Sequence, residues 1–497
     1  MPTPFRLYDT RTRKVDDFTP QEPGKVGIYV CGMTVYDRSH VGHARAMVVF
    51  DSFSRWLRHE GWAVRFVRNF TDIDDKIIAR AAALGVEPAQ LAQDEIDAFH
   101  ADMAALGLLR PDAEPRVTRS MPQILAMIAT LVERGNAYDA EGNVWFSVAS
   151  YAHYGELSGR KLEDMRSADP APGKRAPADF ALWKAAKPGE PAWDSPWGPG
   201  RPGWHIECSA MVKHELGDTV DIHGGGLDLV FPHHENEIAQ SECSNGKPYT
   251  RYWMHNGLLT MASGQKMGKS LGNVTGIGAV LQEYPAEALR LYYLQNHYRS
   301  PLPWNVDALP EALGMLSRLY EAREVGEAMQ GAEDPDLVAA ELGEDAKVVL
   351  AEGRAFTGRF DQALREDFNT SQALAHLFAL ARAVNRFGGH KKAVKRGGPV
   401  VAPALAAFRL VAASLGLMAM DTQAFVEAVK DKRLAALGLR REEIEAMIAE
   451  RVRLRGAKQW SEADAVRQQL DARGIVVSDG PEGSRWRVRL ESPASGA

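Results

Sequence analysis

A strand–helix–strand pattern near the start of the chain constrains the fold more than any other feature. Gly24–Val30 is an apolar run that is typical of a buried strand. Ala44–Glu60 carries apolar residues at helical spacing and ends at Gly61, and Ala63–Phe70 again has the pattern of a strand. Two strands joined by a helix form a βαβ unit, and such units build parallel sheets. We therefore expect an α/β protein with a parallel sheet.

An insertion is predicted within this sheet. Thr219–Ile222 and Tyr252–Leu259 have strand patterns and extend the sheet. Before them, Met165–Gly203 is rich in Pro, Gly and Trp, which predicts irregular structure. We expect a separate inserted segment over 116–200. The chain of 497 residues is long enough for roughly two to four domains.

The C-terminal part of the chain is predicted to be mostly helical. Apolar residues recur at helical spacing over 305–428, apart from Lys391–Val401, which predicts a basic loop. A small unit follows, with a helix over Ser461–Arg473 and strands over Gly474–Val477 and Ser484–Leu490. The α/β part is therefore expected to be followed by a helical bundle and a small α+β unit.

Charge and cysteine content narrow the class of protein. The whole chain has a net charge of −6, whereas Arg451–Leu490 carries nine Lys/Arg and five Asp/Glu. That contrast predicts an anionic partner for the C-terminal end, with a solvated helix face as the structural alternative. Three cysteines do not form a disulfide framework, and Met1–Lys14 lacks the apolar core of a signal peptide. The longest uncharged apolar run, Leu410–Met420, is too short to span a membrane, so we expect a cytoplasmic protein.

Two short motifs indicate phosphate chemistry. HVGH lies between the first strand and the following helix, where backbone N–H groups favour an anion. His40 and His43 are candidate donors to phosphate oxygens, and Gly42 permits a close approach to the backbone. KMGKS adds two candidate phosphate-binding cations, Lys266 and Lys269, in a Gly-rich loop. A capped helix start and an exposed loop would be the structural explanations, but together and in this order the motifs predict ATP-dependent activation of a carboxylic acid.

A second group of residues has the donors of a metal site. Cys31 directly follows the first strand, and Cys208 lies in GWHIECSAM. In FPHHENEIAQ, His233 and Glu237 are four residues apart, on one face of a helix. Two thiolates, an imidazole and a carboxylate suit a tetrahedral zinc site, although His234 with Glu237 is an alternative pair. Two buried free thiols beside an acidic helix start would be the structural explanation.

The motifs together resemble the cysteinyl-tRNA synthetase family, a family of class I aminoacyl-tRNA synthetases. The resemblance rests on YVCGMTVYDRSHVGHAR, RNFTDIDDKI, PGWHIECSAM, DIHGGGLDLVFPHHENEIAQ, KMGKSLGN and GPEGSRWR, which extend through essentially the whole chain. It implies that cysteine and ATP, used with Mg²⁺, give cysteinyl-adenylate and pyrophosphate. The cysteinyl group then passes to the 3′-terminal adenosine of cysteine tRNA. The resemblance also implies a monomer.

The resemblance further implies that each chain binds one Zn²⁺, which would recognise the sulfur of the cysteine substrate. The implied ligands are Cys31, Cys208, His233 and Glu237. A thiol near zinc loses its proton and binds as a thiolate, whereas the hydroxyl of serine is a poorer ligand. Direct ligation of sulfur would thus discriminate against serine without an editing domain.

A domain organisation follows from the resemblance. It implies a Rossmann-type catalytic domain over 1–115 and 201–260, interrupted by the connective insertion over 116–200. Residues 261–308 would form the KMGKS loop and a stem-contact region. A helical-bundle anticodon-binding domain over 309–428 and a small basic tRNA-binding unit over 440–492 would complete the chain.

The resemblance also implies residue roles beyond the metal. Catalysis is expected from His40, His43, Lys266 and Lys269. ATP is expected to contact His40, Gly42, His43, Gly225, Asp228 and Lys269. The cysteine substrate is expected to contact Thr71, Trp204 and His223. The tRNA is expected to contact Arg455, Lys458, Trp460, Arg467, Arg485 and Trp486, which combine cations with aromatic faces for stacking on unpaired bases.

Two rival functions share part of these motifs. A related ligase that joins cysteine to a sugar amine in thiol-cofactor synthesis would keep the catalytic and zinc residues, but it should lack the basic C-terminal unit. A non-catalytic tRNA-binding paralogue would be expected to lose signature residues, which are intact here. Gly268 departs from the family pattern, in which serine usually occupies this place in the lysine motif.

Overall fold

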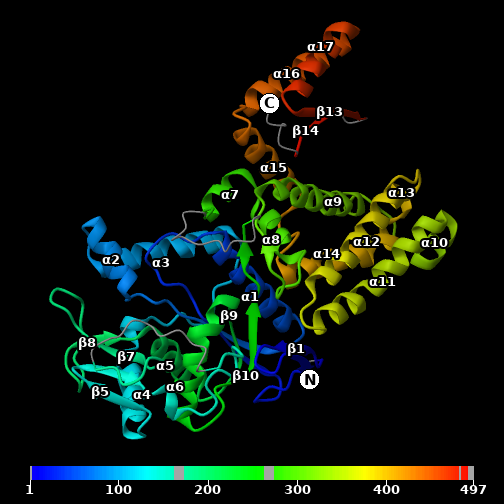
Figure 1. Cartoon of the computed structure of the whole chain (residues 1–497). Coiled ribbons are helices and arrows are strands. Elements are labelled where there is room, and N and C mark those ends of the chain that lie inside the picture. The colour runs from blue at the N-terminus through cyan, green and yellow to red at the C-terminus, as the bar shows by residue number, and fades with distance from the viewer. Residues whose placement is uncertain (1–2, 162–172, 262–273, 481–482, 491–497) are drawn as a thin grey trace.

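The fold is organised around a four-stranded parallel sheet with the strand order β10-β9-β3-β4. The computed structural model describes residues 3–161, 173–261, 274–480 and 483–490 (Figure 1). The strands of this sheet are β3 (Lys25–Val30), β4 (Ala63–Arg68), β9 (Val220–Gly226) and β10 (Thr250–Asn256). The predicted parallel sheet is confirmed, and the carboxyl ends of its strands lie at one edge, where open α/β sheets bind ligands.

Helix α1 (Val41–His59) connects β3 to β4 and is buried against the sheet over most of its length. It begins at Val41 rather than at the predicted Ala44, because the His40 side chain accepts the Gly42 backbone N–H and caps the helix. Gly224 of β9 lies so close to the Phe50 ring of α1 that a Cβ would come within 2.4 Å of it. This glycine lets α1 pack directly on the sheet.

Further helices and a hairpin surround the sheet. α5 (Trp204–Leu216) precedes β9, and α6 (Glu235–Asn245) connects β9 to β10. After β4 come α2 (Asp75–Leu84), which the Asp74 side chain caps, and α3 (Pro88–Ala105). The antiparallel hairpin of β1 (Arg6–Asp9) and β2 (Lys14–Asp17) lies beside β10, where the Thr10 N–H donates to the Trp253 carbonyl.

The insertion between β4 and β9 is a folded unit. It contains α4 (Met121–Glu133) and an antiparallel sheet of β5 (Ala137–Ala140), β6 (Asn143–Phe146), β7 (Phe180–Ala185) and β8 (Gly200–Pro202). The prediction of irregular structure over Met165–Gly203 is therefore wrong where β7 and β8 lie. The glycines in this segment allow close packing, since a Cβ on Gly203 would lie 1.9 Å from the Ala181 carbonyl oxygen.

The segment after β10 connects the sheet to the bundle. Its elements are β11 (Leu259–Thr260), α7 (Ile277–Glu283), α8 (Ala286–Leu294) and β12 (Leu302–Pro303). Arg45 of α1 is buried and donates to the carbonyls of Leu258, at 2.9 Å, and Ser300. The chain just before β11 and just before β12 is thereby fixed to the helix that begins within HVGH.

The predicted helical bundle is confirmed, but one predicted loop within it is wrong. The bundle consists of α9 (Leu309–Glu327), α10 (Pro335–Leu342), α11 (Glu344–Arg365), α12 (Thr370–Gly388), α13 (Ala393–Arg396), α14 (Gly398–Leu415) and α15 (Thr422–Ala436). Most of the expected loop Lys391–Val401 belongs to α13 and α14. Ala393, Val400 and Val401 are fully buried, so core packing outweighs the local Gly and Lys content.

Helix α14 is apolar throughout most of its length. Among the described helices it is the one whose length and composition would allow it to cross a membrane. The core helix of a folded bundle meets the same criterion, and α14 packs against α11, α9 and α1. Its apolar side chains are thus accounted for by contacts within the chain.

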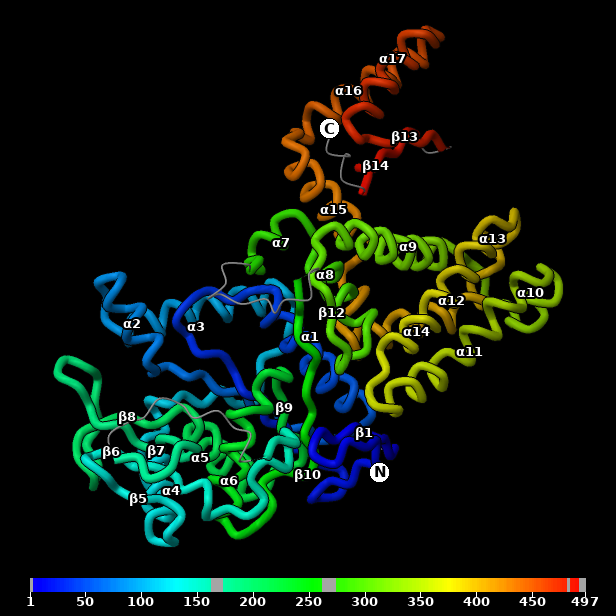
Figure 2. Tube along the Cα trace, viewed as in Figure 1, coloured from blue at the N-terminus to red at the C-terminus, as the bar shows by residue number. Residues whose placement is uncertain are grey.

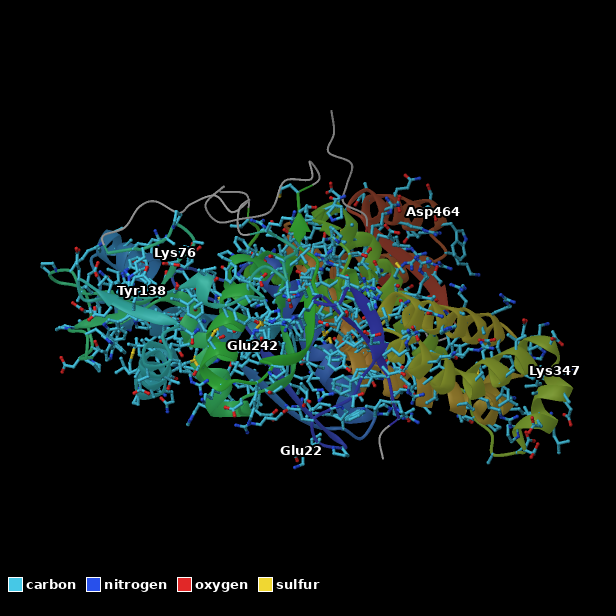
Figure 3. All side chains as sticks on the ribbon, turned by 60° about the horizontal axis from the view of Figure 1, so that its bottom comes forward. Glu22, Lys76, Tyr138, Glu242, Lys347 and Asp464 are labelled. Carbon is cyan, nitrogen blue, oxygen red and sulfur yellow. The ribbon has the colours of Figure 1, made fainter. Side chains whose placement is uncertain are left out.

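The C-terminal unit has a small core of its own. It consists of α16 (Arg441–Gly456), α17 (Trp460–Ala472) and the antiparallel pair β13 (Ile475–Gly480) and β14 (Gly483–Val488), which confirms the predicted helix and strands. Ile444, Leu470 and Ile475 belong to its hydrophobic cluster. Figure 2 shows this unit standing above α9 and α15, away from the insertion. Figure 3 labels Tyr138 of the insertion and Lys347 of the bundle at opposite ends of the molecule.

Candidate active site and metal centre

The four predicted metal ligands come together near the carboxyl end of β3. Cys31 follows β3, Cys208 lies in α5, His233 lies in the turn before α6, and Glu237 lies in α6. Their exposed fractions are 7%, 2%, 1% and 0%. The four donor atoms all lie within 4.8 Å of one another. Residues from three distant parts of the sequence therefore form one buried cluster.

The distances within the cluster suit a shared cation. Cys31 Sγ lies 3.7 Å from Cys208 Sγ, 3.5 Å from His233 Nε2 and 3.4 Å from Glu237 Oε1. His233 Nε2 lies 2.9 Å from Glu237 Oε1, as expected for residues four apart on a helix face. Two sulfurs, one imidazole nitrogen and one carboxylate oxygen are a donor set that zinc accepts.

A second donor set overlaps the first. Cys31, His223, His234 and Glu237 also lie within 4.8 Å of one another. His234 Nε2 is 3.9 Å from Glu237 Oε1, and its Nδ1 is 2.7 Å from His255 Nε2. The sequence alternative with His234 thus has a geometric counterpart, but the set with His233 is the one that includes both thiols.

Burial and the neighbouring ligands together shift the pKa values of the cluster. The hydrogen bond from the Cys31 thiol lowers the pKa of Cys208 to about 6, while burial raises the pKa of Cys31. Burial acts to lower the pKa of His233, but the Glu237 charge and the hydrogen bond to Cys208 raise it to about 10. Burial opposes ionisation of Glu237, yet His223 and His233 hold its pKa well below the usual range. Cys208 and Glu237 are thereby favoured in the charged forms that bind a cation, whereas Cys31 and His233 would each release a proton on binding one.

Two residues that the sequence did not single out contact the ligands. His205 Nδ1 lies 3.0 Å from His233 Nδ1, and the Tyr249 hydroxyl donates to Glu237 Oε2 at 2.6 Å. His205 lies between Trp204 and Cys208 in the sequence, which was its one available signal. Tyr249 lies just before β10 and carries no motif that could have revealed its contact.

The three predicted substrate residues lie around this cluster. The Trp204 ring stacks on His233 with centroids 4.2 Å apart, and His223 Nε2 is 3.5 Å from Cys31 Sγ. Thr71 Oγ1 donates to Glu207 Oε2 at 3.0 Å. Burial raises the pKa of Glu207 well above its usual range. Trp204 and His223 thus contact the donor set directly, whereas Thr71 contacts Glu207, the residue before Cys208.

HVGH forms the capped start of α1. The rings of His40 and His43 stack with centroids 3.9 Å apart, and the His40 N–H donates to His43 Nδ1 at 3.3 Å. A Cβ on Gly42 would lie 2.8 Å from His40 Cε1, so the absent side chain makes room for the capping ring. Gly42 was expected to let a ligand come close to the backbone. In the structure it also makes room for the His40 ring that caps α1.

The residues just after KMGKS lie against HVGH. The Val41 N–H donates to the Thr275 carbonyl at 3.0 Å, and His40 forms an antiparallel bridge with Gly276. Lys266 and Lys269 themselves lie outside the described residues. The described segment that follows the second motif in the sequence therefore lies against the first motif.

The predicted adenosine-contacting residues lie at the end of β9. Gly225 is buried within β9, where a Cβ would lie 2.9 Å from the His234 ring. Asp228 is exposed in the short turn Leu227–Leu229 that follows. Both lie at the carboxyl edge of the same sheet that carries HVGH.

The predicted tRNA contacts of the C-terminal unit include four exposed residues and two half-buried ones. Lys458, Trp460, Arg467 and Arg485 are exposed. Arg455 instead pairs with Asp479, and the half-buried Trp486 ring lies 4.8 Å from Lys430 Nζ. The first four are therefore accessible to a large ligand, while Arg455 also stabilises the unit and Trp486 also joins it to α15.

Comparison with protein families gives matches along most of the chain. The family described as "tRNA synthetases class I (C) catalytic domain" matches residues 17–314. The "DALR domain" matches residues 359–419, and the "Cysteinyl-tRNA ligase anticodon binding domain" matches residues 441–487. The anticodon-binding description thus falls on the C-terminal unit rather than on the bundle.

Known proteins agree with these matches. A cysteine–tRNA ligase of Alkalilimnicola ehrlichii is 50% identical over 97% of this chain and 99% of its own, and one of Geobacter metallireducens is 46% identical over 98% and 100%. Two solved structures share the fold: a LeuRS–tRNA complex from Agrobacterium radiobacter, and Mycobacterium tuberculosis methionyl-tRNA synthetase with methionyl-adenylate. The first has a TM-score of 0.60 and 13% identity, and the match covers 83% of this chain and 87% of that one. The second has a TM-score of 0.58 and 16% identity, and the match covers 84% of this chain and 95% of that one. The chain therefore belongs to the cysteinyl-tRNA synthetase family of class I aminoacyl-tRNA synthetases, the ATP-dependent cysteine–tRNA ligases.

Proposed function

We propose that this chain activates L-cysteine with ATP, giving cysteinyl-adenylate and pyrophosphate, and then transfers the cysteinyl group to the 3′-terminal adenosine of cysteine tRNA. One observation carries the choice of amino acid. A buried cluster of two thiols, an imidazole and a carboxylate lies at the carboxyl edge of the sheet that also carries HVGH. A thiol-recognising centre beside a phosphate-binding helix start suits the adenylation of cysteine.

We propose one Zn²⁺ per chain, held by Cys31, Cys208, His233 and Glu237. The donor set supports zinc, since borderline-soft zinc accepts sulfur, nitrogen and oxygen together. The lowered pKa of Cys208 and of Glu237 supports it as well, because both donors are favoured in their charged form. Bound there, zinc supplies a Lewis acid that prefers a thiolate sulfur to a hydroxyl oxygen.

The protein residues orient the reactants. Trp204 and His223 contact the donor set, and with Thr71 they are proposed to line the cysteine pocket. His40 and His43 are proposed to donate to phosphate oxygens as charge develops during adenylation.

Motif position extends these roles to the rest of the ATP site. Lys266 and Lys269 are proposed to neutralise the departing pyrophosphate of Mg²⁺-bound ATP. Gly42, Gly225 and Asp228 are proposed to contact ATP, supported by their place at the edge where nucleotides bind in open α/β sheets.

Transfer requires tRNA to reach both the sheet edge and the C-terminal unit. We propose that the exposed Lys458, Trp460, Arg467 and Arg485 contact the tRNA, supported by the basic character of this unit. Arg455 and Trp486 are proposed as contacts too, although Arg455 also pairs with Asp479 and Trp486 also contacts Lys430 of α15. The anticodon binding expected of the bundle over 309–428 is instead proposed for the C-terminal unit, where the anticodon-binding family matches residues 441–487. A monomeric state and a cytoplasmic location remain proposals drawn from the family resemblance.

Cysteine-dependent ATP–pyrophosphate exchange, followed by acylation of total tRNA, tests the proposed function. We expect exchange with cysteine but not with serine, and acid-precipitable cysteine on tRNA. Absence of exchange with intact tRNA binding would favour the non-catalytic paralogue. Exchange without acylation, together with ligation to an amino sugar, would favour the ligase of thiol-cofactor synthesis.

A further inference from the structure

The two carboxylate oxygens of Glu237 have different surroundings. Oε1 lies 2.9 Å from His233 Nε2 and 3.4 Å from Cys31 Sγ, so it faces the other donors. Oε2 accepts the Tyr249 hydroxyl at 2.6 Å and lies 3.4 Å from His223 Nε2. Since both Glu237 and Tyr249 are at most 1% exposed, water does not compete for this bond in the described structure.

Tyr249 is itself fixed on both sides of its backbone. Its N–H donates to Glu242 Oε1 at 3.3 Å, and its carbonyl accepts the Val220 N–H at 3.0 Å. Its ring packs beside the rings of His223 and Trp253, with centroid distances of 5.3 and 6.0 Å. A hydroxyl carried by so constrained a residue holds a fixed position relative to β9 and β10.

We propose that Tyr249 is the positioning residue of the metal centre: by holding Oε2, it presents Glu237 to the ion through the single oxygen Oε1. This inference rests on the proposed metal site. Carboxylate ligands bind through one oxygen or two, and a donor on the second oxygen selects the one-oxygen mode. Partners of metal ligands commonly affect metal affinity because they orient the ligand and reduce the cost of ordering it.

Zinc affinity of the full chain, measured by competition with a chromogenic chelator, tests the proposal. Tyr249→Phe keeps the ring and removes the hydroxyl, and we expect zinc affinity to fall by about 10- to 100-fold. Tyr252→Phe is the matched control, since its hydroxyl donates to the Asp17 carbonyl at 2.8 Å, away from the cluster. The control should retain wild-type zinc affinity. Thermal unfolding of both variants shows whether loss of stability accounts for any change.

A double-mutant cycle with Glu237→Ala decides whether Tyr249 acts through Glu237. If it does, Tyr249→Phe will cause little further loss of zinc affinity once the carboxylate is gone. Wild-type affinity in Tyr249→Phe, or an equal loss in both backgrounds, would overturn the positioning role while leaving the zinc site intact. A wild-type chain that binds no zinc would overturn the proposed metal centre together with this role.

Discussion

At the residue scale, the proposed choice of cysteine over serine rests on the sulfur atoms at the end of β3 and in α5. Cys208 is buried and accepts the hydrogen bond of the Cys31 thiol. Cys208→Ser keeps nearly the same shape but replaces a soft donor with a hard one. We expect the variant to lose zinc or, if zinc is retained, to lose at least about tenfold in the kcat/KM ratio of cysteine over serine.

Elemental analysis and pyrophosphate exchange with each amino acid measure both outcomes for Cys208→Ser. Cys243→Ser is the matched control, because Cys243 lies on α6 outside the donor sets. Full zinc content with unchanged kinetics in Cys208→Ser would remove Cys208 from the ligand set.

A second prediction at this scale concerns Gly42. A Cβ there would lie 2.8 Å from His40 Cε1, so Gly42→Ala should displace the ring that caps α1. Loss of the cap should lower the free energy of unfolding by about 1 kcal/mol. Loss of a positioned donor to phosphate should reduce kcat for exchange by about 100-fold.

Gly278→Ala provides the control for Gly42→Ala. Gly278 lies in α7, and a Cβ there meets no atom within 4 Å. This variant should keep its stability and its exchange rate. Exchange at the wild-type rate in Gly42→Ala, despite the lowered stability, would show that the His40 position is not needed for catalysis.

At the element scale, the sequence predicted those helices and strands whose apolar residues recur at regular spacing. The βαβ unit of β3, α1 and β4 was foreseen because apolar spacing changes from strand to helix and back. The prediction of a loop over Lys391–Val401 was wrong because Val400 and Val401 are buried by helices that are distant in the sequence. The Tyr249 contact with Glu237 was not foreseeable, since it depends on how α6 and β10 pack. The choice of His233 over His234 rests on the family resemblance, since the geometry brings both histidines close to Cys31 and Glu237.

The contact between the end of α1 and helix α11 gives a pH-dependent prediction. Asp361 of α11 is 6% exposed and lies close to His59 and Glu60. Burial and the Glu60 charge raise the pKa of Asp361 to about 6. An acid whose pKa is raised by folding destabilises the fold above that pKa, and the cost disappears as the pH falls toward the unfolded value of about 4.

Asp361→Asn removes this cost. The free energy of unfolding should rise by up to about 3 kcal/mol above pH 7, and by about half of that at pH 5. Urea unfolding at pH 5 and pH 8 measures the difference. Asp345→Asn, a substitution at a half-exposed position on the same helix, should show no comparable pH dependence. A gain that is equal at both pH values would contradict the assigned titration.

At the scale of the whole molecule, buried charges connect the catalytic part to the bundle. Arg290 of α8 donates to Asp51 of α1 and to the Leu415 carbonyl at the end of α14, at 2.7 Å each. Glu287 of α8 accepts the N–H groups of Met418 and Ala419. Removing one partner of such a group leaves a buried charge unpaired, which is costly. These contacts therefore fix the position of α8 relative to α1 and the end of α14. The bundle is thereby held in a set orientation to the helix that begins with HVGH.

The C-terminal unit has its own core and meets the rest of the molecule at α9 and α15, so tRNA is the ligand expected to connect it to the active site. Each cation that neutralises a tRNA phosphate releases counterions, which makes binding depend on salt. Lys458 and Arg467 are exposed, and neither has an ion pair within the described residues. The double variant Lys458→Gln/Arg467→Gln should raise the Kd for cysteine tRNA. It should also reduce the slope of log Kd against log salt concentration by about 0.7 to 0.9 per lost contact.

Filter binding at several salt concentrations measures that slope, and pyrophosphate exchange, which needs no tRNA, checks the catalytic domain. Arg453→Gln is the matched control: Arg453 is exposed on α16 of the same unit, but it pairs with Glu450 at 2.7 Å. Because its charge is already neutralised locally, its loss should change the slope much less. If the double variant behaves like Arg453→Gln, the basic charge of this unit is a solvated helix face, and recognition of tRNA must depend on other surfaces.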